Sequence, residues 1–453
     1  MSNDILKKII YNKIEWLKDR KVKQPIKKLQ ENISHSSRDF YDISKKNTPF
    51  FILEAKQYSP SIGRIHNTFD IKKICAQYKN HATAISILTD EKYFKGKFEF
   101  LLEAHQLVKQ PILCKDFFID PYQIYLARYY QADIILLMLS ILNDSQYIIL
   151  SNLAHSLNMS IITEINNKNE LYRAIKLNAQ IIGINNRNLH NLSININKTY
   201  ELAPLIPKNK IIISESGIYN HTQVQKLKKV VHGFLIGSSI MKSSNITLKI
   251  NSIIFGNNKI CGLTRVKDAK RIQKLGAVYG GLIFVKTSIR KINIHVAKNI
   301  VCQSKLKYIG VFKNENIQKI KFIIIILSLY AIQLHGNENI RYIINIKNII
   351  PKNIKIYKAL DMNKCKKNIQ CKYIDFYLFD NDQGGSGKCF DWSILNRYNL
   401  SNVFLSGGLS VKNCMKAMQY NCFGLDFNSK IETTPGIKNF LKMQLLFKKL
   451  KNL

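Results

Sequence analysis

The sequence lacks paired-cysteine motifs and glycine-rich nucleotide loops. Its nine cysteines are scattered with no CxxC pair, and the nearest neighbours, Cys365 and Cys371, have no second pair or nearby histidine pair beside them. This spacing argues against a structural zinc site and a disulfide framework, and it favours a reduced, cytoplasmic setting. The absence of GxGxxG and Walker sequences argues against a doubly wound dinucleotide-binding sheet and a P-loop protein.

Long uninterrupted apolar runs are also missing. The stretch 322–334 is apolar but too short to span a bilayer, so we interpret it as a helix end that runs into a buried strand. Residues 1–21 place apolar side chains at helical spacing between charges, which predicts an amphipathic helix rather than a signal peptide.

Acidic residues are scarce relative to basic ones. The 69 Lys and Arg against 30 Asp and Glu give a formal net charge of +39. Such a surplus often marks a nucleic-acid or membrane partner. Here the lysines are scattered, and the abundance of Lys, Asn and Ile is typical of A/T-rich codons. We therefore expect neither partner, although a basic nucleic-acid-binding protein that kept a barrel fold remains an alternative.

What the sequence does contain is a repeated alternation of short β-rich runs with helical patterns. A chain of 453 residues fits two domains, and each half carries eight such runs. This predicts an α/β protein with two tandem (β/α)8 TIM barrels, residues 1–255 and 256–453, joined by a short turn near Gly256. The predicted strands of the first half are 51–56, 84–90, 112–117, 134–140, 160–165, 181–187, 211–217 and 233–239. Those of the second half are 259–264, 279–285, 307–312, 331–336, 355–360, 376–381, 403–409 and 424–429.

The last two predicted strands of each half end in glycine and serine. The first half has SESG at 214–217 and GFLIGSS at 233–239, and the second has LSGGL at 405–409 and GLDFNS at 424–429. Loops at these places in a barrel bind phosphate through backbone N–H groups. The repeat predicts two barrels that each handle a phosphorylated substrate.

Charged and polar residues cluster at the predicted strand ends of the first half. Because charges on buried strands are costly unless paired or functional, they indicate proton transfer at a carbonyl or hydroxyl group, with lysine as acid and glutamate as base. The residues are Glu54, Lys56, Lys115, Glu164, Asn185, Arg187 and Ser216.

The second half places Cys261 after its first strand and Asp380 after its sixth. A lone cysteine is more often a small buried residue, but this one has a carboxylic acid as a potential partner at the same barrel end. A thiolate that removes a carbon-bound proton while an acid protonates a ring oxygen suits an aldose–ketose rearrangement.

The motifs FILEAKQYSPS, ILCKDFFIDPYQI, TEI, GINNRNL, ISESG and GFLIGSS closely resemble indole-3-glycerol-phosphate synthase over nearly all of residues 1–255. The resemblance implies Lys115 as the general acid that activates the substrate carbonyl and Glu164 as the general base, with Glu54 and Lys56 assisting. Which lysine serves which step stays open. Asn185, Ser216, Ser59 and Arg187 would position the substrate, and Gly217, Gly237 and Ser238 would hold its phosphate.

The motifs KICGLTR, GGLIFVKTSIR, QLHG, FDNDQGGSG, LSGGL and GLDFNSKIETTPGIK resemble phosphoribosylanthranilate isomerase over roughly 256–453. That family performs an Amadori rearrangement whose product is the substrate of the first. The resemblance implies Cys261 as general base and Asp380 as general acid, with no metal or organic cofactor in either half. Arg290 would bind the anthranilate carboxylate, Gln333 and His335 would line the site, Asp426 would contact the ribose, and Gly385, Gly408 and Ser429 would bind phosphate. A lone histidine is more often a packed or hydrogen-bonded residue, and we expect that structural role for His335.

Two positions depart from the second family's pattern. Ile289 replaces the proline of the usual TSPR turn, and Asp382 replaces a glycine after Asp380. Either change could loosen the anthranilate pocket, so a chain in which only one barrel works, the other serving as a scaffold, remains an alternative. The simplest interpretation is a bifunctional enzyme of tryptophan synthesis that works as a cytoplasmic monomer.

Overall fold

The structure, a computed structural model, describes residues 5–46, 48–61, 63–65, 69–364, 371–381 and 387–451. Its contacts divide the chain into two units, Met1–Tyr219 with Gln223–Lys249 and Asn220–Thr222 with Ile250–Leu453. The division falls inside helix α13 (Ile246–Ile254), just before the turn at Gly256. Asp382 and Gly385 lie outside the described residues.

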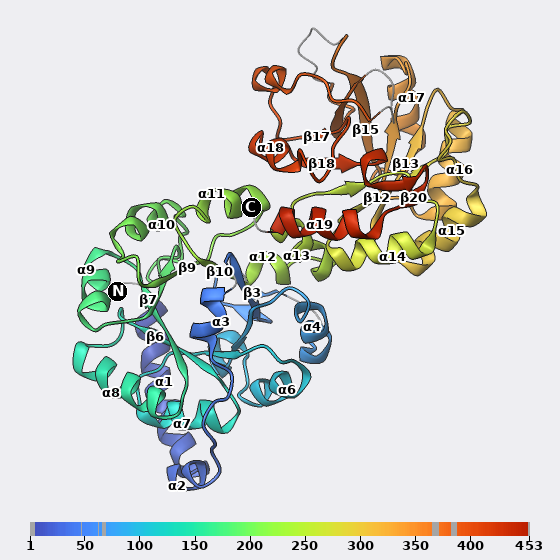
Figure 1. Ribbon diagram of the computed structural model, residues 1–453. Helices are drawn as coiled ribbons and strands as arrows, with labels where there is room; N and C mark the ends of the chain where they lie inside the picture. The colour runs from blue at the N-terminus through green and yellow to red at the C-terminus, as the bar shows by residue number, and fades with distance from the viewer. Residues whose placement is uncertain are drawn as a thin grey trace. The chain divides into compact units, whose positions relative to one another are not determined.

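The first unit is a closed barrel of eight parallel strands that pair in chain order (Figure 1). The strands are rich in isoleucine and leucine because each is covered by helices on one side and by the barrel interior on the other. The predicted architecture is confirmed. The strands are β1 (Phe50–Ala55), β4 (Ala84–Leu88), β5 (Ile112–Lys115), β6 (Ile134–Met138), β7 (Ser160–Ile165), β8 (Ile181–Asn185), β9 (Ile211–Glu215) and β10 (Gly233–Ile236).

Helices surround this barrel, and several begin at side-chain caps. Asp120 and Asn143 each form a capping box, which satisfies backbone N–H groups that the first helical turn leaves unpaired. The helices are α1 (Ile5–Lys23), α2 (Ile26–Gln30), α3 (Phe40–Lys46), α4 (Ile71–Tyr78), α5 (Glu91–Phe94), α6 (Glu99–Leu107), α7 (Pro121–Tyr129), α8 (Asp144–Ser156), α9 (Lys168–Lys176), α10 (Asn197–Leu202), η1 (Ala203–Leu205), α11 (His221–Leu227) and α12 (Ser238–Met241).

The second unit is again a closed barrel of eight parallel strands. Its strands are β11 (Lys259–Ile260), β12 (Tyr279–Ile283), β13 (Lys307–Phe312), β14 (Ala331–Leu334), β15 (Lys355–Asp361), β16 (Phe376–Asp380), β17 (Val403–Leu405) and β18 (Gly424–Phe427). Its helices are α14 (Val266–Leu275), α15 (Ile294–Gln303), α16 (Ile317–Leu327), α17 (Ile340–Ile349), η2 (Trp392–Arg397), α18 (Cys414–Gln419), η3 (Ser429–Ile431) and α19 (Phe440–Lys451). Across the described part of the chain, no helix has both the length and the apolar character needed to cross a membrane.

Most predicted strands run past the observed ones at their carboxyl ends. The prediction 403–409 compares with β17, which ends at Leu405, and 259–264 compares with β11, which ends at Ile260. After β11 and β17 the chain leaves the ladder at glycines with positive φ, Gly262 at 69° and Gly407 at 83°. The polar residues expected at strand ends therefore lie partly in the following loops. Two of these loops form short hairpins, β2 (Tyr58–Ser59) with β3 (Gly63–Arg64) and β19 (Glu432–Thr434) with β20 (Ile437–Lys438).

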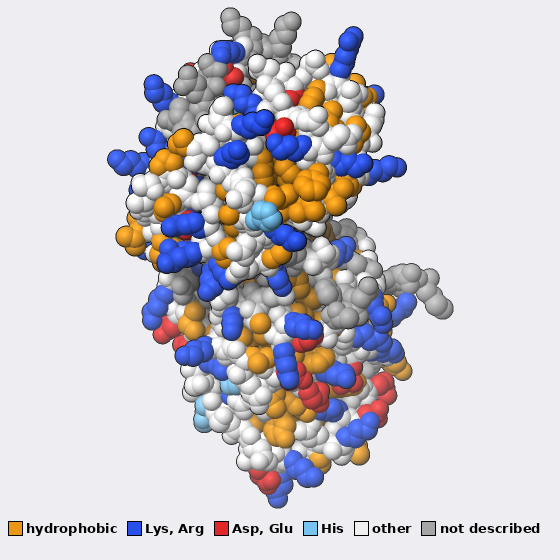
Figure 2. Space-filling model, turned by 90° about the vertical axis from the view of Figure 1, so that its right-hand side faces the viewer, with side chains coloured by type: hydrophobic (Ala, Val, Ile, Leu, Met, Phe, Trp, Pro, Cys, Tyr) orange, Lys and Arg blue, Asp and Glu red, His pale blue; other side chains and the backbone are white. Residues whose placement is uncertain are grey.

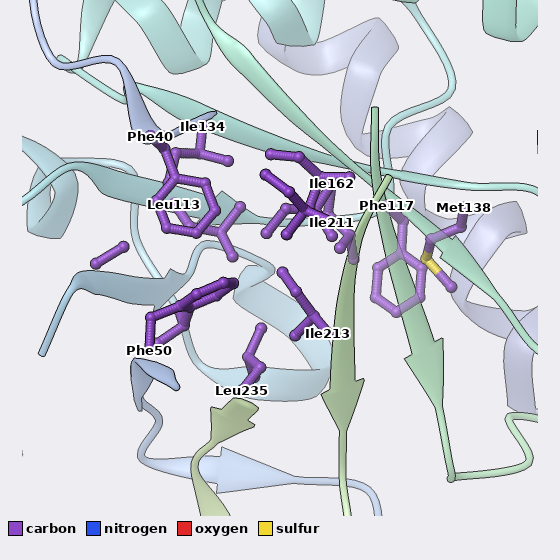
Figure 3. Packing of buried hydrophobic residues seen from close by; sticks show 14 of the residues in the cluster. Phe40, Phe50, Leu113, Phe117, Ile134, Met138, Ile162, Ile211, Ile213 and Leu235 are labelled. Atoms are coloured by element: carbon purple, nitrogen blue, oxygen red, sulfur yellow. The ribbon is translucent and has the colours of Figure 1, made fainter. Parts of the chain in front are cut away.

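The interior of the first barrel is filled by layers of apolar side chains (Figure 3). Phe50, Leu113, Ile134 and Ile213 point toward one another from different strands, and all four are fully buried. Since side chains alternate between the two faces of a strand, the inward positions nearer the carboxyl ends include the charged residues Glu54, Lys115 and Glu215. The apolar layers thus form the floor beneath a charged upper layer.

Helix α1 is fastened to the first barrel by a buried lysine. Lys13 Nζ lies 2.9 Å from Asp90 Oδ2 and 2.7 Å from Asp116 Oδ1, and its side chain is 3% exposed. Burial alone would lower the pKa of Lys13, but the carboxylates of Asp116 and Asp90 raise it above its ordinary value. The ion pairs connect the helix to the loops that follow β4 and β5.

Replacing Lys13 with methionine leaves both carboxylates buried without their cation. We expect the free energy of unfolding of the first unit to fall by about 3–5 kcal/mol. Trp16 reports the urea transition in a Trp392→Phe background, since the chain has two tryptophans. Lys18→Met on the same helix is the matched control, because Lys18 is exposed and forms an ion pair with the exposed Glu15. Equal urea midpoints for Lys13→Met and Lys18→Met would contradict the role of Lys13 in anchoring the helix.

Candidate active sites

The first cavity opens at the carboxyl ends of the strands of the first barrel. It brings together nearly all of the residues that the sequence predicts for this half: Glu54, Lys56, Lys115, Glu164, Asn185, Arg187, Ser216, Gly217, Gly237 and Ser238. Ser59 lies instead in an adjoining cavity that it shares with Lys56 and Arg187, beneath the first turns of α1. Glu215 also lines the first cavity, and the sequence analysis did not identify it.

Lys115 is held between two carboxylates. Its Nζ lies 3.1 Å from Glu215 Oε2 and 3.5 Å from Glu164 Oε2. Burial would lower the pKa of Lys115, but Glu215, Glu164 and Glu54 together raise it, so the ammonium keeps a proton to donate. The remaining oxygens, Glu164 Oε1 and Glu215 Oε1, are buried and find no hydrogen-bond partner in the described part of the chain.

The pKa values of two carboxyl groups in this site, Glu215 and Glu54, are shifted in opposite directions. Burial and the nearby Glu164 raise the pKa of Glu215, while Lys115 opposes the shift. Burial would also raise the pKa of Glu54. The cations Lys56, whose Nζ lies 2.5 Å from Glu54 Oε1, and Lys115 outweigh burial and lower this pKa below its ordinary value. Carboxyl groups whose pKa values are driven apart can divide acid and base roles between them.

The rim of the first site is organised by short polar contacts. Asn185 Oδ1 accepts a hydrogen bond of 2.9 Å from the Arg187 N–H, and Arg187 Nη1 donates to the carbonyl of Leu192 at 2.9 Å. Ser216 has a φ of 66°, an unfavourable value for a residue with a Cβ. With this left-handed backbone conformation, Ser216 turns the chain sharply directly after β9, at the wall of the cavity.

The turn after β10 brings backbone close to the charged layer. A Cβ on Gly237 would lie 2.2 Å from Glu54 Oε1, so only glycine fits there. Helix α12 begins at the next residue, Ser238, so its first N–H groups have no partner within the helix, and Gly237 and Ser238 both line the cavity. Such a turn suits a bound phosphate.

The second cavity opens at the same end of the second barrel and has a volume of about 530 Å³. Lys313 and Asn428, which the sequence analysis did not identify, also line it. The predicted residues that it brings together are Cys261, Arg290, Gln333, His335, Asp380, Gly408, Asp426 and Ser429.

Cys261 and Asp380 are both buried at this cavity. Burial raises the pKa of the Cys261 thiol, while Lys259 and Lys438 oppose the shift. Burial likewise raises the pKa of Asp380 to about 6, although its oxygens accept hydrogen bonds from the Asn381 N–H at 2.8 Å and the Ser406 hydroxyl at 3.2 Å. A carboxylic acid with a pKa near neutrality is suited to donate a proton.

Beneath the cavity lies Lys259, which the sequence analysis also missed. Its side chain is fully buried, and its Nζ donates to Asp426 Oδ2 at 2.7 Å and to Gln333 Oε1 at 2.8 Å. Asp426 Oδ1 is buried and finds no hydrogen-bond partner among the residues that the structure describes. Asp426 is therefore anchored through one oxygen, and the residue lines the cavity.

The side chain of Arg290 is held by Glu432, a residue of the β19–β20 hairpin. Glu432 accepts hydrogen bonds from Arg290 Nε at 3.0 Å and Nη2 at 2.8 Å, and Lys438 pairs with the same carboxylate at 2.7 Å. The neighbouring Ile289, where the related sequences have proline, is 73% exposed. The β19–β20 hairpin thus orients the guanidinium group without a stiff loop.

The last loops of the second barrel mirror those of the first. Gly408 has a φ of 64°, which favours glycine, and the short helix η3 begins at Ser429 directly after the β18 strand and Asn428. Both residues line the cavity. Within the described residues no group of three or more His, Cys, Asp or Glu side chains could hold a metal ion.

Two of the residues that the sequence analysis missed, Glu215 and Lys259, could have been found from the alternation of side chains along a strand. Glu215 lies two positions after Ile213, and Lys259 lies two positions before Cys261, so strand alternation puts each on the interior face. Glu432 had no such signal, because its partner Arg290 lies 142 residues away and in a different loop.

Comparison with known proteins gives two matches along the chain. The family model described as indole-3-glycerol phosphate synthase matches residues 6–253, and that described as N-(5'-phosphoribosyl)anthranilate (PRA) isomerase matches residues 258–449. The tryptophan biosynthesis protein TrpCF of Buchnera aphidicola subsp. Schizaphis graminum is 54% identical over 450 residues, which cover 99% of this chain and 100% of that protein. TrpCF of Salmonella typhi is 47% identical over 447 residues, 99% of each chain.

The raised pKa of Asp380 predicts that the residue destabilises the fold at neutral pH. An ordinary carboxyl group, with a pKa of 3.8, ionises in the unfolded chain well before Asp380, at about 6, ionises in the folded one. Stability is therefore lost as the pH rises from about 4 to 6, by about 3 kcal/mol for a shift of about two units.

The free energy of unfolding of Asp380→Asn should therefore exceed that of the wild type by about 3 kcal/mol at pH 7.5, and by roughly half as much at pH 5. The measurement is urea unfolding of the second unit, followed through Trp392 in a Trp16→Phe background. A gain that does not depend on pH, or a loss at pH 7.5, would contradict the assigned burial cost.

Proposed function

The chain belongs to the family of fused indole-3-glycerol phosphate synthases and phosphoribosylanthranilate isomerases, and we propose which of its side chains carry each reaction. It is a bifunctional enzyme of tryptophan biosynthesis. The second barrel isomerises N-(5-phosphoribosyl)anthranilate to 1-(2-carboxyphenylamino)-1-deoxyribulose 5-phosphate. The first converts this product to indole-3-glycerol phosphate with loss of carbon dioxide and water. The boundary we propose between the two lies near Gly256.

In the isomerase, Asp380 donates a proton to the ring oxygen of the ribose, and the C1–O bond breaks to leave an iminium ion between C1 and the anthranilate nitrogen. Cys261, as the thiolate, then removes the proton from C2, and the resulting enol gives the ketone after proton transfer to C1. The supporting observation is that both side chains line one cavity, with the pKa of Asp380 raised to about 6. The atoms balance without an oxidant or reductant.

The same cavity offers a place for each end of the substrate. The guanidinium group of Arg290, fixed by Glu432, would bind the anthranilate carboxylate. The carboxylate of Asp426, which lines the cavity, would accept a hydrogen bond from a ribose hydroxyl. Gly408 and Ser429 would hold the phosphate at the last two loops.

In the synthase, Lys115 protonates the carbonyl oxygen of the substrate while the carboxyl-bearing ring carbon attacks the carbonyl carbon. Loss of carbon dioxide restores the electrons to the ring, and loss of water completes the indole. The ammonium of Lys115, kept protonated between Glu215 and Glu164, carries this assignment. Glu164 would act as the base, with Glu54 and Lys56 assisting.

Other side chains of the first barrel would position the substrate. Asn185, Arg187 and Ser216 line the cavity beside Lys115. Ser59, in the adjoining cavity, would contact the substrate near Lys56. The phosphate would bind at Gly217, Gly237 and Ser238, where α12 begins.

We also propose that the substrates are the main anionic partners of this basic chain. Figure 2 shows lysine and arginine side chains spread over the visible face of both units, without a single basic patch. A dispersed charge suits attraction of sugar phosphates better than sequence-independent nucleic-acid binding. A monomer in the cytoplasm remains the prediction of the sequence.

Replacing Lys115 with alanine should lower formation of indole-3-glycerol phosphate about 100-fold or more, because the acid is lost. Isomerase activity of the same sample should not change. The exposed Lys109→Ala is the matched control. Each activity is measured on the full-length chain with its own substrate. Substantial synthase activity in Lys115→Ala would overturn the assignment.

Replacing Cys261 with serine should cripple the isomerase and spare the synthase, since a serine hydroxyl is a far weaker base than a thiolate. Loss of substrate fluorescence reports the isomerase, and indole absorbance reports the synthase. The exposed Cys302→Ser is the matched control. If both activities fell together while the chain stayed folded, the two-site model would be wrong.

A further inference from the structure

A chain of polar contacts leads from the buried Lys259 to His335, whose ring lies beside Asp380 at the wall of the isomerase cavity. Lys259 Nζ donates to Gln333 Oε1 at 2.8 Å, and Gln333 Nε2 lies 2.9 Å from His335 Nδ1. The other ring nitrogen, His335 Nε2, lies 3.9 Å from Asp380 Oδ2. Gln333 is 1% exposed, so its contact with Lys259 is shielded from bulk water, whereas the His335 side chain is 26% exposed at the cavity.

The hydrogen-bonding abilities of these groups fix the direction of the chain. An ammonium group only donates, so Lys259 must face the carbonyl end of the Gln333 amide. The NH2 end of Gln333 then faces His335 Nδ1, which has to accept. A neutral imidazole that accepts at Nδ1 carries its proton on Nε2.

The surroundings keep His335 neutral. Burial lowers the pKa of His335 to about 4, and the cations Lys259, Lys358 and Lys313 act in the same direction. Glu338 opposes them, but its carboxylate is paired with Lys358 at 2.7 Å. Asp380 faces the other side of the ring.

We propose that Lys259 is a positioning residue that, through Gln333, holds His335 as the neutral tautomer with its proton on Nε2. We further infer that this N–H donates a hydrogen bond to an oxygen of the ribose chain beside the one that Asp380 protonates. The donor is suited to the site because the ring lines the cavity next to Asp380. The second part rests on the proposed isomerase function, whereas the first does not.

The tautomer is tested on the full-length chain labelled with [15N]histidine, without substrate. The His335 signals are assigned by their absence in His335→Gln. At pH 7.5 we expect a protonated Nε2 and an unprotonated Nδ1. Gln333→Glu is the decisive variant, because a carboxylate still accepts from Lys259 but can only accept from Nδ1 as well. It should move the proton to Nδ1.

A wild-type ring that carries its proton on Nδ1, or a ring protonated on both nitrogens, would overturn the assignment. So would an unchanged tautomer in Gln333→Glu. Lys259→Met should leave a mixture of both tautomers, since Gln333 is then free to rotate. A single unchanged tautomer in Lys259→Met would remove Lys259 from the proposal. None of these readings depends on enzymatic activity.

The donor role is tested by kinetics. His335→Leu and Gln333→Glu should each lower kcat/KM of the isomerase by roughly 10- to 100-fold, as expected for the loss of one hydrogen bond in the transition state. His335→Gln should recover much of that loss, because its amide NH2 reaches the place of Nε2–H. An active wild-type isomerase with an unaffected His335→Leu variant would overturn the donor role. An inactive wild type would instead count against the proposed function, while the tautomer result stands.

Discussion

The pairing of charges inside a closed barrel is the constraint on which both active sites depend. Inward-facing side chains of a parallel barrel are shut off from water except at the strand ends, so an ionised group there needs a partner of opposite charge. Lys115 meets this requirement between Glu164 and Glu215, and Lys259 meets it with Asp426. In each barrel the apolar layers below carry the fold, and the paired layer above carries the chemistry.

The two sites use this constraint in different ways. Around Lys115 the carboxylates outweigh burial, so the pKa of the lysine rises and the site retains a proton. Around Asp380 burial outweighs the hydrogen bonds from Asn381 and Ser406, so the pKa of the acid rises instead. The first barrel thus keeps Lys115 protonated by pairing it with carboxylates, and the second raises the pKa of Asp380 by removing it from water.

Much of this arrangement could be predicted from the sequence. The alternation of short apolar runs with helical patterns predicted all the strands of both barrels, because parallel barrel strands are buried on both faces. Most site residues were found through the motifs, but Glu215 and Lys259, which belong to the same motifs, were missed, although strand alternation places them inside. Glu432 could not be found, since its contact with Arg290 joins loops that only the closed barrel brings together. The ends of β11 and β17 were predicted too late in the sequence, because the ladder stops where Gly262 and Gly407 turn the chain.

The central claim is that one chain holds two complete and separate active sites. The most direct test mixes equal amounts of Lys115→Ala and Cys261→Ser and supplies N-(5-phosphoribosyl)anthranilate. Each variant alone should fail to form indole-3-glycerol phosphate, whereas the mixture should form it after a lag, as the intermediate diffuses from one chain to the other. A mixture that stays inactive, although each variant retains its remaining activity, would contradict the account.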